Sequence, residues 1–183
     1  MSMISTLTPR RLPILEIFKH AKDQGYTKYG EMFSVNNMKS LINASPLSIW
    51  FDAVIYSGGI LPRKKQIIAA MCKGALILIP YDADKNYAPV CLMGHKAHWA
   101  VLCGIIDDSK NCVVVARQGK SKYVSLWLLD ELDRSNNNLM ECDPERAKCG
   151  FVISDLSLEL AGKYIVLNPK SQSKDVHILT NII

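Results

Sequence analysis

A histidine that begins an apolar run is the clearest chemical group in this sequence. Segment 94–101 reads GHKAHWAV, so His98 stands immediately before residues that predict a strand. An imidazole held there can take the proton of a thiol and later return it to a leaving amine, because imidazole titrates near neutrality. His98 is therefore our candidate general base. The alternative is a structural histidine that only begins a strand.

A side-chain amide follows the next predicted strand. Residues 113–116 lead into Arg117 and Gln118, and the loop DDSK at 107–110 predicts an antiparallel hairpin. His98 and Gln118 then end neighbouring strands, so we expect them within about 4 Å of each other or one water apart. Gln118 would fix the tautomer of the imidazole, the role of the third member of a triad. A simple turn residue is the alternative.

Two metal sites are alternatives to this interpretation. Cys91, His95 and His98 are ligand types that zinc accepts, but Pro89 and Gly94 interrupt the segment and a fourth ligand is missing. Residues 81–84 (YDAD) alternate carboxylates as a calcium loop does, without the glycine and distal glutamate of such loops. We expect a turn at 81–84 and no metal or other cofactor.

The composition is typical of one folded domain and argues against a nucleic-acid-binding or membrane-spanning protein. The chain has 183 residues, 49% hydrophobic and 21% charged, which is typical of one folded domain, so we expect a single domain over 1–183. The net charge of +5 is scattered and lacks interleaved aromatic residues, which argues against nucleic-acid binding. No apolar run approaches the roughly 18 residues of a membrane span.

The cysteines indicate the compartment. Six cysteines occur without a secretory signal or a C-x-x-C pair, so we expect free thiols and a cytoplasmic location. We expect Cys72 to lie in the core, beside Met71 on the apolar side of a helix.

The elements that must position His98 fall into two groups. Helices are predicted at 12–23, from the cap Ser34 to before Pro46, and from Pro62 to 72, with a strand at 49–56. The second half predicts a helical turn over 126–132 and a set of short strands: 75–81, 99–106, 112–116, 151–153 and 164–167. Helices followed by antiparallel strands predict an α+β fold.

Several blocks of this sequence together resemble one protein family. They are Gly25-Tyr26-Thr27 with 30–35 (GEMFSV), 78–82 (LIPYD), 94–101, 118–121 (QGKS) and 131–136 with its Arg134-Ser135-Asn136 end. In order and spacing they are similar to the actin maturation proteases, cysteine aminopeptidases related to papain-like and bacteriocin-leader peptidases. The resemblance implies a papain-like fold, and hydrolytic removal of N-acetylated Met or Cys from the N-terminus of immature actin. It implies the actin N-terminus as substrate partner.

The family's nucleophile segment is missing from the sequence. In that family the nucleophile is the cysteine of a Gln-Cys-Gly segment at the start of a helix, upstream of the Gly-Tyr-Thr block. No Gln-Cys-Gly occurs here, and the first cysteine is Cys72. We therefore expect a chain that begins at or after the nucleophile helix and is inactive alone. A non-catalytic actin-binding or regulatory form is the alternative. Cys91, seven residues before His98, is a weak substitute because no helix N-terminus lowers its pKa.

Two partner surfaces complete the expectations. The proline-rich N-terminal region of vertebrate members, which offers a binding site for profilin, has no counterpart in this sequence. Residues 63–65 together with Lys120 and Lys122 are expected to form a positive rim suited to the acidic N-terminus of actin.

Overall fold

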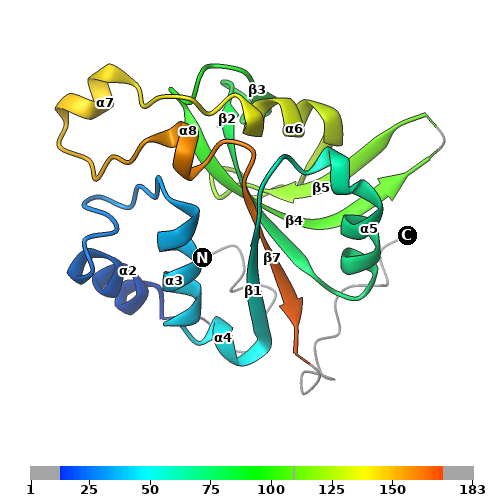
Figure 1. The fold of residues 1–183 in the computed structure, drawn as a ribbon, viewed down its shortest axis with the longest axis horizontal. Coiled ribbons are helices and arrows are strands. Elements are labelled where there is room, and N and C mark those ends of the chain that lie inside the picture. Colours follow the sequence, from blue (N-terminus) through cyan, green and yellow to red (C-terminus); the bar gives the residue numbers. More distant parts are fainter. Residues whose placement is uncertain (1–12, 109, 171–183) are drawn as a thin grey trace.

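Two amphipathic helices begin the described part of the chain, residues 13–108 and 110–170 of a computed structural model (Figure 1). They are α2 (Ile14–Asp23) and α3 (Val35–Asn43). Ser34 caps α3 as expected, because its hydroxyl oxygen accepts the Asn37 N–H at 3.2 Å. Gly25 follows α2 with φ of +71°, a conformation that favours glycine. Both predicted helices are confirmed.

A seven-stranded sheet forms the centre of the rest of the described chain. Its main path is β1-β7-β2-β4-β5-β6, with β3 paired to β2, and every pairing is antiparallel. The strands are β1 (Phe51–Tyr56), β2 (Leu76–Ala83), β3 (Pro89–Val90), β4 (Ala97–Asp107), β5 (Cys112–Arg117), β6 (Ser125–Leu128) and β7 (Tyr164–Pro169). The α+β expectation and the hairpin between β4 and β5 are confirmed.

Two local expectations are wrong, and a third is right only in its second half. Residues 151–153 form no strand, because Val152 donates its N–H to the Glu31 carboxylate and not to a sheet partner. The predicted helical turn at 126–132 is a strand as far as Leu128 and then helix α6 (Leu129–Asn137). Segment 81–84 is not a turn, because β2 continues to Ala83 and buries Asp82 completely.

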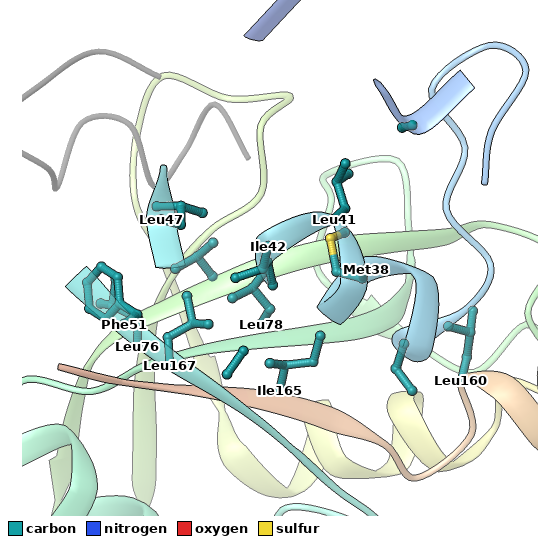
Figure 2. Packing of buried hydrophobic residues seen from close by; sticks show 14 of the residues in the cluster. Met38, Leu41, Ile42, Leu47, Phe51, Leu76, Leu78, Leu160, Ile165 and Leu167 are labelled. Carbon is teal, nitrogen blue, oxygen red and sulfur yellow. The ribbon is translucent and has the colours of Figure 1, made fainter. Parts of the chain in front are cut away.

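One face of the sheet packs on α3, which in turn packs on α2. Figure 2 shows Met38, Leu41 and Ile42 of α3 above Leu76 and Leu78 of β2 and Ile165 and Leu167 of β7, all buried. Leu47, in the short helix α4 (Leu47–Trp50), and Phe51 close one end of this cluster. The α3 stripe follows the 3.6-residue repeat, which is why its sequence predicted a helix.

The opposite face packs on α5 (Lys64–Cys72), which follows the 3₁₀ turn η1 (Leu61–Arg63), and on α6. Ile67 of α5 and Leu132 of α6 are buried there against Ile77, Ala100 and Val114. Cys72 at the end of α5 is exposed, so its predicted core position is wrong. Two short helices, α7 (Pro144–Lys148) and α8 (Leu156–Glu159), complete the fold. None of the described helices is long and apolar enough to cross a membrane.

Part of the first face extends beyond α2 and α3. The helix α3 contacts β1 and β7, whereas β4, β5 and β6 extend away from it (Figure 1). The register aligns Ile106 with Val113 and Leu128, and Gly104 with Val115 and Leu126, so these six apolar residues share that face. Ile106 and Leu126 are 57% and 64% exposed. We call these six residues the outer sheet face.

Candidate active site

A cavity of about 540 Å³ lies between loop 29–33, which joins α2 to α3, and the sheet residues around Pro80 of β2, the start of β4 and the end of β5. Its volume is within the range of small-ligand sites. His98 and Gln118 both line it, as the sequence predicted for one site. The other lining residues are Tyr29, Gly30, Glu31, Met32, Phe33, Met38, Pro80, Ala97, Trp99, Gly119, Lys120, Arg146, Phe151 and Leu160.

The position of His98 is set by the strand and by the residue before it. His98 is half-buried in β4 and pairs with Tyr81 of β2. Its Nδ1 lies 2.7 Å from the carbonyl oxygen of Ala97. Because a carbonyl only accepts, Nδ1 carries the proton in this arrangement and Nε2 keeps its lone pair. Nε2 is therefore the atom of His98 that can act as a base.

Gln118 is buried directly after β5, with 3% of its surface exposed. Its Oε1 accepts the Lys120 N–H at 2.9 Å, which holds the turn at 118–120. Among the described residues, no hydrogen bond engages its amide nitrogen and none joins it directly to His98. The amide is a free donor in the cavity wall. The orienting role of Gln118 stays a prediction.

The six cysteines all lie in the described part of the chain, are free, and do not line the cavity. Cys91 is exposed and shows no hydrogen bond to His98 in that part. Burial raises the pKa of the Cys103, Cys112 and Cys142 thiols above the ordinary value, which makes them poorer nucleophiles.

His95 does not join His98 in a metal site. Its Nε2 lies 2.9 Å from Glu141 Oε1, an exposed ion pair when the ring is protonated. No group of three His, Cys, Asp or Glu side chains within residues 13–108 and 110–170 is placed to hold a metal ion.

The predicted basic rim is only partly at the cavity. Lys120 lines it, whereas Lys122 and residues 63–65 do not. Arg63 donates to the Ser57 carbonyl at 2.6 Å, and Lys64 pairs with Asp107 at 2.5 Å. A second cation at the cavity, Arg146 of α7, was missed because only the tertiary fold brings it to the cavity wall.

Glu31 is a cavity residue whose role the sequence did not reveal. Its carboxylate accepts the N–H groups of Val152, Lys28 and Tyr29 at 2.7–2.9 Å. Burial alone would raise the pKa of Glu31, but these donors outweigh it and lower the pKa to about 2. Glu31 is therefore a structural anion that joins two walls of the cavity.

Trp99, the residue after His98, fastens β4 to the same loop. Its indole N–H donates to the Met32 carbonyl at 2.8 Å. Beside it, the Tyr29 and Phe151 rings meet edge to face, with centroids 5.5 Å apart. The GEMF block of the sequence thus forms one wall of the cavity that His98 also lines.

Ser135 and Asn136, which end another motif of the sequence, are buried beneath the site. The Asn136 amide donates to the carbonyls of Pro80 and Lys163 at 2.9 and 3.1 Å. This contact locks α6 to β2 at Pro80, a residue of the cavity. The sequence signal for this role was the polarity of the two side chains, because polar side chains that are buried are held by hydrogen bonds.

Comparison with known proteins matches residues 1–106 to a family model described as "Actin maturation protease-like, C-terminal domain". The chain belongs to this family. The matched segment contains His98 and the loop that forms the cavity wall. Gln118 lies beyond it.

Curated relatives of this actin maturation protease-like chain carry the name "Actin maturation protease". The protein from Danio rerio is 31% identical over 90% of this chain and 66% of its own length. That from Drosophila melanogaster is 37% identical over 69% and 46%, and that from Homo sapiens 28% over 90% and 58%. The chain thus spans about half to two thirds of these relatives. No solved structure shows significant similarity to it.

Proposed function

We propose that the cavity is the histidine side of a cysteine peptidase site that matures actin. The reaction removes the N-acetylated Met or Cys from the N-terminus of immature actin, and takes place in the cytoplasm. The observation that supports it most directly is His98, whose Nδ1 is held by the Ala97 carbonyl while Nε2 stays free beside a peptide-sized cavity. The name of the relatives supports actin as substrate.

The chemistry follows from the free Nε2. It takes the proton of a thiol, and the thiolate attacks the carbonyl carbon of the terminal residue. When the C–N bond breaks, the imidazolium returns the proton to the leaving amine and an acyl-enzyme remains. Water, deprotonated by the same Nε2, then hydrolyses the thioester. In the Nδ1–H form the ring proton is bound by the Ala97 carbonyl and the Nε2 lone pair faces the thiol, so Gln118 can orient the imidazole only where its Oε1 takes the place of that carbonyl as acceptor.

The thiol comes from polypeptide outside this sequence. The six cysteines lie away from the cavity, and three of them have raised pKa values. The resemblance implies a Gln-Cys-Gly segment at the start of a helix, and about a third to a half of each relative's own length lies outside the part it shares with this chain. The outer sheet face is apolar and exposed, and gives such a helix a surface that includes Gly104 and Ile106 of β4, six and eight residues along the strand from His98.

A non-catalytic actin-binding form is the second candidate. The cavity walls are held by their own contacts, such as Glu31 with Val152 and Trp99 with Met32. A chain without the thiol would therefore still present a formed cavity to the actin N-terminus.

Cleavage of an acetyl-Met actin peptide tests the proposal. We expect no turnover by the 183-residue chain, and turnover once a Gln-Cys-Gly segment of a relative is added ahead of Met1. His98→Ala in the extended protein removes cleavage, because no group then accepts the thiol proton. His20→Ala, on α2 and outside this cavity, is the matched control and retains cleavage.

Turnover by the unextended chain, or an extended protein indifferent to His98→Ala, would place the chemistry on other residues. Peptide binding by the unextended chain without turnover by any extended protein would favour the actin-binding form.

A further inference from the structure

A carboxylate that the proposed reaction does not use is buried next to the base. Asp82 lies in β2 with no exposed surface. Its Oδ2 accepts the N–H groups of Leu92 and Gly94 at 2.9 and 2.7 Å, and its Oδ1 accepts that of Lys96 at 2.9 Å. One side chain therefore organises the whole loop that leads into β4.

This loop ends at the atoms that hold His98. Two turns shape it, with His95 N–H donating to Leu92 and Ala97 N–H donating to Gly94. Ala97 is the sheet partner of Asp82, and its carbonyl oxygen lies 2.7 Å from His98 Nδ1. The position of that carbonyl is thus fixed by the residues that Asp82 binds.

We propose that Asp82 is the positioning residue for His98: through loop 92–96 it holds the Ala97 carbonyl that keeps the imidazole in its Nδ1–H form. This rests on the proposed role of His98 as general base. In the described structure no hydrogen bond joins Asp82 to the imidazole, so it acts through the loop and not on the reacting atoms.

Helix α6 also binds the backbone at Asp82. Ser135 Oγ accepts the Asp82 N–H at 2.9 Å and donates to the carbonyl of Val90 at 2.6 Å. The backbone at Gly94 lies very close to the segment after α6, because a Cβ there would lie 2.4 Å from the Glu141 carbonyl oxygen. The loop is therefore fixed between β2 and the segment after α6.

The three donors require a carboxylate. An asparagine at this position has nearly the same volume, but its NH₂ group would face at least one backbone N–H. A donor facing a donor leaves both without a partner in a buried place, which costs more than a lost hydrogen bond. Asp82→Asn therefore changes the loop with little change in packing.

Nitrogen-detected NMR of the histidine rings tests the inference, since the ¹⁵N shifts distinguish the two neutral tautomers. We expect His98 of the parent protein in the Nδ1–H form. In Asp82→Asn we expect loss of that signature in favour of Nε2–H, and about 10- to 100-fold faster amide exchange at Gly94 and Lys96. A purely structural role would lower stability and leave the tautomer unchanged.

Asp84→Asn is the matched control. Asp84 also accepts two backbone N–H groups, from Asn86 and Ala88 at 2.7 and 2.8 Å, but in a turn that does not lead into β4. We expect His98 to keep its tautomer in this variant. If Asp82→Asn does not fold, Gly94→Ala displaces the same loop with Asp82 intact, and the same tautomer change is expected.

The inference is overturned if His98 of the parent protein is in the Nε2–H form. It is also overturned if the Nδ1–H signature persists when exchange at Gly94 and Lys96 has become fast. A His98 in the Nδ1–H form in an extended protein that does not cleave peptide would count against the proposed function alone.

Discussion

Glu31 Oε1 accepts the Val152 N–H at 2.9 Å, although the two residues are 121 positions apart in the sequence. The same carboxylate binds the N–H groups of Lys28 and Tyr29, so it ties the loop before α3 to the segment before α8. Both segments line the candidate active site. The shape of the cavity therefore depends on one ionised side chain.

This dependence predicts a loss of stability in acid. The pKa of Glu31 is lowered from 4.5 to about 2 in the folded protein. Its contribution is therefore fully present above about pH 4.5, and is lost as the pH falls from there toward 2. Glu31→Gln should lower the free energy of unfolding at pH 7 by about 1–3 kcal/mol, and the difference from the parent should vanish near pH 2.

Urea unfolding between pH 2 and 7 measures this difference. Glu145→Gln is the control, because Glu145 forms only an exposed pair with Lys148 and should change stability by about 0.5 kcal/mol or less. A Glu31→Gln deficit that stays constant over the whole range would show that shape, and not charge, is what matters at this position.

Asn136 should be worth far more to stability than its neighbour. Its amide donates to the Pro80 and Lys163 carbonyls inside the protein, whereas the Asn137 amide donates to Asp133 at the exposed side of α6. Asn136→Ala should cost about 2–4 kcal/mol of unfolding free energy and Asn137→Ala about 0.5 kcal/mol or less. Similar costs in thermal unfolding would contradict the buried role of Asn136.

The sequence predicted the periodic elements well and the sheet edges poorly. The stripe of α3 and the run of β2 follow regular repeats, and both were located within two residues or so. Segment 126–128 has the same apolar character in a strand and in a helical turn, so only its pairing with Val113–Val115 decides it. Residues 151–153 look like a strand, but their N–H partner is the distant Glu31 carboxylate.

The sequence predicted the part of the candidate site that depends on neighbouring strands. His98 begins β4 and Gln118 follows β5, and a hairpin brings such ends together. Asp82, Glu31 and Arg146 were missed because their partners lie 10 to 121 residues away, or in another element. Their roles depend on tertiary contacts, which no spacing rule contains.

Thiol reactivity should separate the cysteines by burial. Cys72, Cys91 and Cys149 are exposed, whereas burial raises the pKa of Cys103. Iodoacetamide at neutral pH should therefore modify the three exposed thiols first and Cys103 several-fold more slowly, as followed by peptide mass mapping.

The same measurement tests Cys91 as a substitute nucleophile. Its rate should be the same in the parent and in His98→Ala, because no contact joins the two side chains in the described structure. A Cys91 rate that falls with His98→Ala would revive the substitute nucleophile.

The outer sheet face should make the isolated chain self-associate. Ile106 and Leu126 expose more than half of their surface next to Val113 and Val115, and a large apolar patch is unusual on a monomer. Leu126→Lys should reduce both self-association in sedimentation velocity and binding of the dye ANS. Leu15→Lys, on α2 and 82% exposed, is the control and should change neither. Equal effects of the two variants would remove the special role of this face.

Lys120 should select acidic peptides. It lines the cavity with Arg146, while the one carboxylate among the lining residues, Glu31, is already engaged by N–H donors. The charge left for a ligand is therefore positive. For a peptide with acidic residues after the acetylated terminus, Lys120→Ala should weaken binding about two- to fivefold at low salt, and less at high salt. The matching peptide with amides in place of the carboxylates should bind both proteins alike.

Lys122→Ala is the matched control, because Lys122 lies over the Tyr123 ring and away from the cavity lining. Equal losses for both peptides in calorimetry, or an equal effect of Lys122→Ala, would show that Lys120 does not read charge.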